Sequence, residues 1–158
     1  IHRWLWLLRV KRTVASHQGN IFVGGRVYLS RYTHLKANVN FNGMKVVGRG
    51  RCMIGAYFHS GQECMIITEI HNYDLGQAIP YDNTEITKDV IIEDFVWLGA
   101  RVLILPGVTI GEGAIIQAGA VVVNDIPKYA IAGGSPAKVF KYRDICHFEE
   151  MKAKQKFH

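Results

Sequence analysis

A histidine and a tryptophan hold equivalent places in a repeating pattern of the sequence. His71 is the sixth residue of a block that begins at Ile66, and Trp97 is the sixth residue of a block that begins at Ile92. A neutral imidazole can take a proton from a hydroxyl group, and the unperturbed pKa of histidine, about 6.5, is close to cellular pH. His71 is therefore a candidate general base if the fold brings these two residues together. The alternative is an exposed histidine at a corner of the fold.

The pattern has a period of six residues and is most regular between residues 92 and 127. Ten of its twelve first and fifth positions are Ile, Leu or Val, and the other two are Ala. An α-helix would spread these positions over three faces, and Pro106 and five glycines would interrupt it. The pattern instead predicts a β-solenoid, in which short strands meet at a corner every six residues and point one residue per block inward. The first positions are Ile92, Leu98, Ile104, Ile110, Ile116 and Val122, and the fifth are Val96, Val102, Val108, Ala114, Ala120 and Ile126.

Several motifs in a fixed order resemble those of a known family. They are Val96-Trp97-Leu98-Gly99-Ala100, Leu105-Pro106-Gly107-Val108-Thr109-Ile110-Gly111, Ala118-Gly119-Ala120-Val121-Val122 and Ala132-Gly133-Gly134-Ser135-Pro136-Ala137-Lys138-Val139. In this order they resemble the hexapeptide-repeat acyltransferases, most of all the maltose, galactoside and polysaccharide O-acetyltransferases. The resemblance is dense over residues 90–141 and thinner over residues 20–89. It implies a left-handed parallel β-helix with three flat faces, in which each coil consists of three six-residue blocks.

The coil length predicts where His71 and Trp97 lie. The interval between them equals one coil of three six-residue blocks plus eight inserted residues. Residues 73–89 break the period with Gly, Pro and Asn, so we expect a loop that holds the insertion. His71 and Trp97 would then occupy the same corner of neighbouring coils, about 4.8 Å apart.

The resemblance also gives His71 a chemical role. Ile70-His71-Asn72 matches the position of the family's catalytic histidine, which takes a proton from an acceptor hydroxyl as that hydroxyl attacks the thioester of acetyl-CoA. A second group usually orients such a base. The sequence leaves this group open among Glu69, Asp74, Asp82 and Glu85 or a backbone carbonyl.

Small side chains predict a place for the coenzyme. Ala100 and Ala118 are separated by three six-residue blocks, so they should stack on adjacent coils and leave a shallow groove for an extended pantetheine arm. The alternative is that both alanines only pack. The resemblance assigns acetyl-CoA to this track, although the family often has Thr-Lys where this chain has Val123-Asn124. The complete expected set is Trp97, Ala100, Ala118, Val123, Asn124, Lys138 and Lys141, in which the two lysines would meet coenzyme phosphates.

The acceptor is expected to contact residues near His71 and one residue far before it. Asn72 and Tyr73 follow the histidine directly. Val39-Asn40-Phe41-Asn42 resembles an acceptor-binding segment of galactoside acetyltransferase, although Asn40 fits an ordinary turn equally well. His59 lies two thirds of a coil before His71, so the two should project from different corners. A metal site of His34, His59 and His71 would need several subunits, and no metal is expected.

Composition limits the partners and the compartment. The 158 residues carry a net charge of +6, which favours an anionic partner such as a coenzyme phosphate, an anionic glycan or a membrane surface. Nucleic acid is not expected, because no basic run or binding motif is present. Cys52, Cys64 and Cys146 are odd in number and widely spaced, which predicts no disulfide framework and a reducing cytoplasm. Cys64 falls on an inward position and should be an inert, buried thiol.

These observations predict three segments. Residues 1–19 form a cap on the solenoid or an interfacial membrane anchor, residues 20–136 form the β-helix with its loop at 73–89, and residues 137–158 form a helical segment. The expected activity is acetyl-CoA-dependent O-acetylation of a sugar in bacterial surface polysaccharide synthesis, in the cytoplasm near the inner face of the membrane. The alternatives are N-acetylation of an amino sugar or a non-catalytic scaffold. The resemblance implies a homotrimer with sites between subunits.

Overall fold

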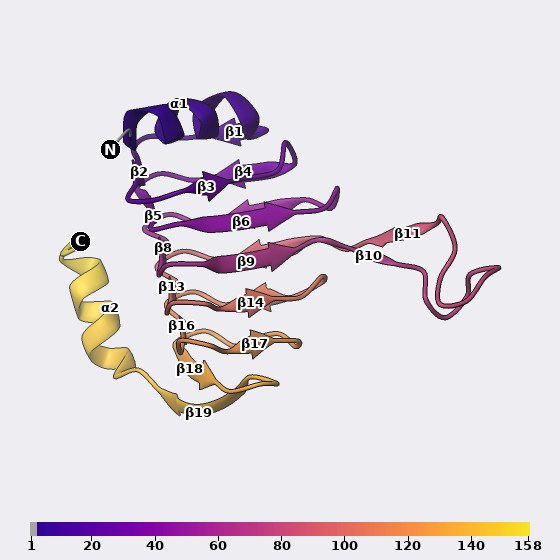
Figure 1. Cartoon of the computed structure of the whole chain (residues 1–158). Helices are drawn as coiled ribbons and strands as arrows, with labels where there is room; N and C mark the ends of the chain where they lie inside the picture. Colours follow the sequence, from indigo (N-terminus) through magenta and orange to yellow (C-terminus); the bar gives the residue numbers. More distant parts are fainter. Residues whose placement is uncertain (1–2) are drawn as a thin grey trace.

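The chain winds into a β-solenoid of about six turns with a short helix at each end (Figure 1). The structure is a computed structural model and describes residues 3–158. Most turns contribute one short strand to each of three parallel sheets, here called sheets A, B and C. The fold confirms the predicted all-β solenoid with helical segments at its ends.

Each sheet is a ladder of strands from successive turns. Sheet A contains β1 (Ser16–His17), β4 (Thr33–Leu35), β7 (Cys52–Ile54), β12 (Val90–Ile92) and β15 (Thr109–Ile110). Sheet B contains β2 (Ile21–Val23), β5 (Val39–Phe41), β8 (His59–Ser60), β13 (Trp97–Leu98), β16 (Ile115–Ile116), β18 (Ala130–Gly133) and the antiparallel β19 (Lys138–Tyr142). Sheet C contains β3 (Val27–Tyr28), β6 (Met44–Val47), β9 (Cys64–Ile67), β14 (Leu103–Ile104) and β17 (Val121–Val122).

The core is the interior of the solenoid, and the six-residue period describes it well. All twelve inward positions predicted between residues 92 and 127 are buried, none more than 4% exposed. Cys64 also points inward, as predicted, and is 2% exposed. Burial of these aliphatic side chains stabilises the fold by about 25 cal/mol per Å² of apolar surface removed from water.

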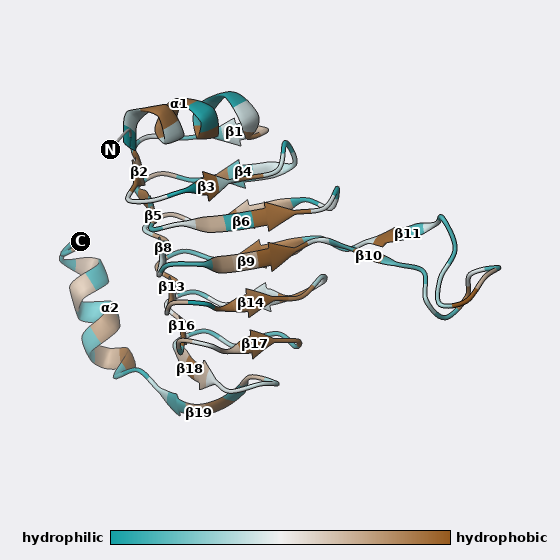
Figure 2. Ribbon diagram, viewed as in Figure 1, coloured by the Kyte–Doolittle hydropathy of each residue, from teal (hydrophilic) through white to brown (hydrophobic). Residues whose placement is uncertain are grey.

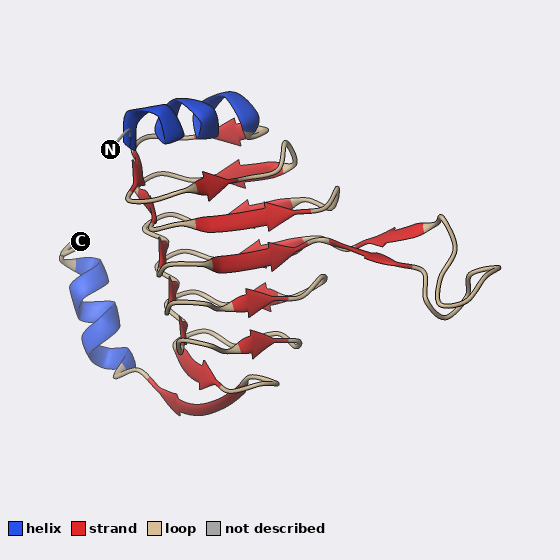
Figure 3. Ribbon diagram, in the orientation of Figure 1, coloured by secondary structure: helices blue, strands red, loops and turns tan. Residues whose placement is uncertain are grey.

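A hairpin arm interrupts the stack where the sequence predicted a loop. The arm consists of β10 (Glu69–His71), β11 (Glu85–Thr87) and the loop between them, and it projects from the edge between sheets C and A (Figure 3). Ile54 pairs with Ile92 of the next turn, and the interval between them equals one coil of three six-residue blocks plus twenty inserted residues. The predicted insertion of eight residues is wrong, because the arm includes two paired strands as well as their loop.

The first helix lies across the open end of the solenoid. Helix α1 (Arg3–Thr13) buries Val10 and packs Trp6 and Leu7 against the core of the first turn. It thereby covers apolar side chains that the first coil would otherwise expose to water. Residues 1–2 of the predicted N-terminal segment lie outside the described residues. Neither helix of the described chain is long and apolar enough to cross a bilayer.

The second helix returns from the last turn onto the edge between sheets A and B. Helix α2 (Ile145–Ala153) begins after Asp144, whose Oδ1 accepts a hydrogen bond of 2.9 Å from the backbone N–H of His147. The predicted helical segment is shorter than expected, because residues 138–142 form β19 and pair with β18. Phe148 of α2 packs edge-on against Phe95 at a corner of the solenoid, with ring centroids 5.9 Å apart.

Candidate active site

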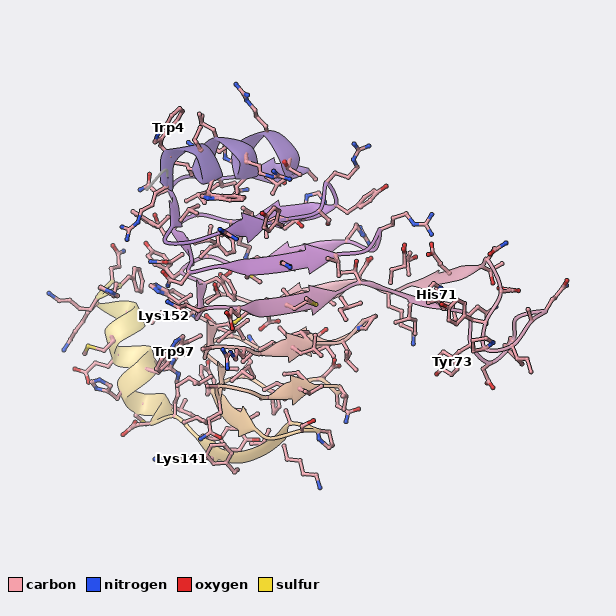
Figure 4. The ribbon with its side chains drawn as sticks, viewed as in Figure 1. Trp4, His71, Tyr73, Trp97, Lys141 and Lys152 are labelled. Atoms are coloured by element: carbon pink, nitrogen blue, oxygen red, sulfur yellow. The ribbon has the colours of Figure 1, made fainter. Side chains whose placement is uncertain are left out.

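His71 ends the first strand of the arm and is exposed to solvent. Its imidazole lies flat against the ring of Tyr81, with centroids 3.8 Å apart and planes inclined by 5°. Tyr73 lies farther out on the same arm (Figure 4). The arm therefore exposes the candidate base and Tyr73, while Asn72 between them is half-buried.

Hydrogen bonds within the arm fix the shape of its loop. The Asp82 carboxylate accepts from the backbone N–H groups of Gln77 and Thr84, both at 2.8 Å, and from the Thr84 hydroxyl. The Thr84 hydroxyl and these amides lower the pKa of Asp82. Asn72 donates to the Thr84 hydroxyl at 3.1 Å and accepts from the backbone N–H of Leu75 at 3.2 Å. The Asn72 amide thus holds the loop, whatever contact it also makes with an acceptor.

A clamp holds the base of the arm to the solenoid. The Arg49 guanidinium donates to Glu69 at 2.6 Å and also pairs with Glu85 on the second strand. The hydrogen bond from Arg49 is the main reason that the pKa of Glu69 is lowered. Two of the carboxylates proposed to orient His71 are therefore engaged by Arg49, and Asp82 is engaged by the loop.

Tyr81 is the residue that the sequence did not identify. Within residues 3–158 the close ring neighbour of the His71 imidazole is Tyr81. The contact depends on the arm folding back on itself across ten residues, so no period or spacing in the sequence indicates it.

Trp97 lies on a different part of the solenoid from His71. It belongs to β13 in sheet B, where it pairs with His59 of the turn before and Ile115 of the turn after. Figure 4 shows Trp97 near α2 and His71 out on the arm at the other side of the molecule. The predicted meeting of His71 and Trp97 within one chain is wrong. Twelve extra inserted residues, two thirds of a coil, move the neighbour of Trp97 from position 71 to position 59.

An open groove around Trp97 lies between sheet B and α2. The groove has a volume of about 690 Å³, and Trp97 is 53% exposed within it. His59 contributes to its wall and places its Nε2 atom 3.2 Å from the backbone oxygen of His158. Asn40 pairs with His59 in the register of sheet B, so the structure places Asn40 on the Trp97 side and not with His71. His59 is consequently the rival candidate for a base near Trp97.

The two predicted alanines stack at the edge between sheets B and C. The Ala100 carbonyl accepts from the backbone N–H of Gly119 at 2.8 Å, which places Ala100 and Ala118 on adjacent turns as predicted. A Cβ atom added to Gly99 would lie 2.5 Å from the backbone nitrogen of Ala118, so the turns approach closely here. Ala118 is exposed and Ala100 is half-buried.

The other residues expected to bind the coenzyme lie at two further places. Lys138 and Lys141 are exposed on β19 at the last turn. Val123 and Asn124 follow β17 at the edge between sheets C and A, which is also the edge from which the arm projects. The outer face of sheet C therefore lies between the alanine edge and the arm.

This outer face of sheet C is apolar from Met65 onward, whereas the outward residue that pairs with Met65 in the preceding turn is Lys45. Met65, Leu103 and Val121 form a half-buried row in register across three turns, and Val47 and Ile67 pair beside them. Figure 2 shows the strands of this sheet largely in the colours of hydrophobic residues. An apolar sheet face of this kind is typical of a surface that a partner covers.

Comparisons with known proteins show what the chain is similar to. Residues 89–124 match the family model described as bacterial transferase hexapeptide (six repeats). The structure superimposes on a maltose O-acetyltransferase from Clostridium difficile 630 with a TM-score of 0.75 and 28% identity, covering 85% of this chain and 73% of that chain. It also superimposes on a galactoside acetyltransferase in complex with coenzyme A, with a TM-score of 0.72 and 27% identity, covering 84% of this chain and 67% of that one.

Curated relatives match shorter segments. A putative acetyltransferase of Schizosaccharomyces pombe is 64% identical over 85 residues, which are 54% of this chain and 40% of that protein. A 2,3,4,5-tetrahydropyridine-2,6-dicarboxylate N-acetyltransferase of Staphylococcus aureus is 56% identical over 52 residues, which are 33% of this chain and 22% of that protein. These matches thus span less than two thirds of either relative.

Residues 89–124 consist of hexapeptide repeats, and the chain is similar to the hexapeptide acetyltransferases that its motifs resemble. Its solenoid matches their left-handed β-helix. Within residues 3–158 no group of three or more His, Cys, Asp or Glu side chains is arranged to hold a metal ion.

Proposed function

We propose that this protein transfers an acetyl group from acetyl-CoA to the hydroxyl of a sugar, with His71 as the general base. The observation that carries this proposal is that the arm presents an exposed imidazole away from its own solenoid, on the edge next to the apolar face of sheet C. The likeness to a maltose O-acetyltransferase and to a galactoside acetyltransferase with bound coenzyme A supports the reaction class.

The site would lie between two copies of the chain. His71 and Trp97 lie on different parts of one solenoid. A single chain therefore does not bring its own base close to Trp97 and the neighbouring Ala100. The half-buried apolar row of Met65, Leu103 and Val121 lies beside the arm and suits contact with a second copy. A closed assembly such as a homotrimer would repeat this contact and give each copy one complete site.

In this arrangement the coenzyme follows the alanine edge of one copy. The small side chains of Ala100 and Ala118 leave room for the pantetheine arm beside the backbone, and the thioester would lie close to Ala100. Lys138 and Lys141 are exposed toward the last turn and carry charges that attract coenzyme phosphates. Trp97 precedes Ala100 in the same turn and offers an exposed ring to the acyl end.

The neighbouring copy would supply the base and the acceptor contacts. The His71 imidazole takes the proton of the acceptor hydroxyl while the hydroxyl oxygen attacks the thioester carbon. The carbon–sulfur bond then breaks, the acetyl group remains on the sugar oxygen, and the imidazolium returns its proton to the departing thiolate. Proton transfer by a positioned base contributes about 10²–10⁴-fold in rate, and alignment of the two substrates adds more.

The first test separates His71 from its rival His59. His71→Ala should lower kcat by about 10²–10⁴-fold, the usual worth of a general base, while acetyl-CoA still binds. His59→Ala, the matched control on sheet B, should retain most of the turnover. If His59→Ala abolished turnover and His71→Ala did not, the base would be His59.

A second test asks whether the site spans two copies. His71→Ala removes the base and Ala118→Trp obstructs the coenzyme track, so each variant alone should have little activity at limiting acetyl-CoA. When the two are unfolded together and refolded, about a quarter of the sites should combine an intact base with an intact track in a random assembly. No recovery of activity in mixed assemblies of confirmed composition would place the whole site within one chain.

The acceptor is the finer part of the proposal. We propose a sugar of a bacterial surface polysaccharide, in the cytoplasm near the membrane, because the N-terminal end of the solenoid exposes apolar and cationic side chains. The segment that matches an N-acetyltransferase supports transfer to nitrogen as the second candidate, and an amino sugar is the acceptor that we would test for it. A screen of hydroxyl and amino sugars, with product mass and base-lability, distinguishes an ester from an amide. Undetectable acetyl-CoA binding at millimolar coenzyme would instead favour a scaffold.

A further inference from the structure

Charge is distributed very unevenly along the chain. No Asp or Glu precedes Glu63 in the sequence. The segment before Glu63 nevertheless contains ten of the 19 Lys and Arg residues. Because the chain stacks turn upon turn, this segment forms helix α1 and the turns beneath it, so one end of the solenoid is strongly basic. The ten are Arg3, Arg9, Lys11, Arg12, Arg26, Arg31, Lys36, Lys45, Arg49 and Arg51.

Acidic residues from later turns neutralise only the cations farther from α1. Asp94 pairs with Lys36 at 2.9 Å and Asp89 pairs with Arg51 at 2.7 Å, while Glu69 and Glu85 pair with Arg49. Within residues 3–158, the cations of α1 and Arg26 of the first turn form no ion pair. The excess positive charge is therefore concentrated at the α1 end.

Helix α1 also exposes large apolar side chains on the face turned away from the core. Trp4, Leu5 and Leu8 are 60%, 45% and 40% exposed, whereas Trp6 and Leu7 pack against the core. Figure 4 shows Trp4 at the outer side of the helix, at the end of the solenoid. Such exposure is unfavourable in water, and it occurs here beside cations instead of acidic residues.

A shallow hollow joins the two features. It has a volume of about 830 Å³ and combines the apolar side chains of Leu5 and Leu8 with the guanidinium groups of Arg9, Arg12 and Arg26. Arg9 is held over the ring of Tyr28, 4.9 Å from its centroid, so one charge of the hollow has a fixed position. Apolar side chains flanked by arginines suit the boundary between acyl chains and anionic headgroups.

We propose that the α1 end of the solenoid binds the surface of an anionic phospholipid bilayer. Trp4, Leu5 and Leu8 would enter the headgroup region, and Arg9, Lys11, Arg12 and Arg26 would meet lipid phosphates. A nucleic acid would satisfy the cations but leave the aliphatic side chains in water, and a second copy of this end would place like charges together. Because α1 lies across the end of the stack, the arm and sheet C stay clear of the membrane (Figure 1).

Vesicle flotation tests this proposal on the unmodified chain. Vesicles of phosphatidylcholine with about 30% phosphatidylglycerol should float the protein, vesicles of phosphatidylcholine alone should not, and 0.5 M salt should weaken the binding. Arg9→Gln with Lys11→Gln and Arg12→Gln should reduce the partition coefficient by about 100-fold, at roughly fivefold per cation near the surface. Lys154→Gln with Lys156→Gln on the C-terminal segment is the control for charge loss and should change binding little.

The apolar contribution needs a separate variant and control. Trp4→Ser with Leu8→Ser should weaken binding to anionic vesicles by tenfold or more, whereas Phe140→Ser, which removes an exposed ring from β19, should not. Circular dichroism and the elution volume check that each variant is folded. Equal binding to neutral and anionic vesicles, unchanged binding of either α1 variant, or tighter binding to a DNA or RNA duplex than to vesicles would overturn the proposal. The proposal would also be overturned if the unmodified chain did not bind vesicles but self-associated, and if Trp4→Ser with Leu8→Ser abolished that self-association.

Discussion

The phenol ring of Tyr81 lies parallel to the imidazole of His71, 3.8 Å from it between centroids. The two residues come from opposite sides of the arm, which is closed by antiparallel pairing of β10 with β11. Aromatic stacking at this distance restricts rotation of the imidazole about its side-chain torsion. Tyr81 therefore acts as a positioning residue for the proposed base.

Replacing Tyr81 should affect turnover through its ring and not through its hydroxyl. Tyr81→Leu should lower kcat by about tenfold with a smaller change in KM, because a base that rotates freely is less often aligned. Tyr81→Phe keeps the stacked ring and should retain most of the activity. Steady-state kinetics of both variants provide the measurement. Equal losses in the Phe and Leu variants would assign the effect to the hydroxyl instead.

Arg49 should control how firmly the arm is held. Replacing it with Met removes its hydrogen bond to Glu69 and its ion pair with Glu85, so amide hydrogens of residues 69–87 should exchange faster and kcat should fall severalfold. Arg51→Met is the matched control, because Arg51 pairs with Asp89 outside the arm. Unchanged exchange in the Arg49 variant would show that strand pairing alone fixes the arm.

The clamp also predicts a dependence on pH. Arg49 lowers the pKa of Glu69 in the folded chain, so the contribution of this pair is present above the unfolded pKa of about 4.3. It is lost as pH falls through the lower folded pKa, when the carboxylate is protonated. The difference in arm exchange between wild type and Arg49→Met should therefore be full at pH 7 and shrink below pH 4. A difference that persisted unchanged at pH 3 would contradict this account.

The repeating part of the fold could be predicted because one physical rule determines it. A residue such as Ile104 or Ile116 is inward because every sixth residue reaches the equivalent position on the next side of a three-sided coil, and both are fully buried. The stacking of Ala100 on Ala118 follows from the same rule. The period, the core and the stacking of the two alanines are therefore all consequences of sequence spacing.

The same rule fails wherever the chain leaves the coil. The six-residue period does not give the length of an insertion. It therefore predicted that His71 lies beside Trp97 on the neighbouring turn, whereas the residue that pairs with Trp97 is His59. The length of the arm is set by pairing of Glu69 with Thr87 and Ile70 with Ile86, which the period does not encode. Neither the stacking of Tyr81 nor the placement of α2 on the edge between sheets A and B could be predicted from spacing.

Close approach of two turns predicts the effect of a single methyl group at Gly99. In Gly99→Ala the added Cβ would lie 2.5 Å from the backbone nitrogen of Ala118, and neither backbone can move without disturbing the ladder. We expect a loss of about 1–3 kcal/mol in unfolding free energy, as for overpacked positions. In the control Gly25→Ala the nearest atoms are 3.4 Å away, so stability should change little. Urea unfolding of both variants measures the difference.

Blocking the alanine edge should affect the coenzyme without affecting the fold. The Ala118 side chain is exposed, so Ala118→Trp should leave the unfolding midpoint within the range usual for surface substitutions. The bulky ring would occupy the proposed pantetheine track, and the Kd for acetyl-CoA should rise at least tenfold. Calorimetric titration measures this Kd. Normal affinity in a folded Ala118→Trp variant would remove the alanine edge from the coenzyme site.

The three cysteines should differ sharply in reactivity. Burial raises the pKa of Cys52 to about 12 and also raises the pKa of Cys64, whereas Cys146 is exposed on α2. Since the thiolate is the reactive form, a disulfide reagent at pH 8 should label one thiol per folded chain and three after unfolding. Cys146→Ser should abolish the fast phase, and fast native labelling of two or more thiols would show that the core opens. Because the folded pKa of Cys52 is the higher one, its contribution to stability is full below about pH 8.5 and declines as pH rises toward 12.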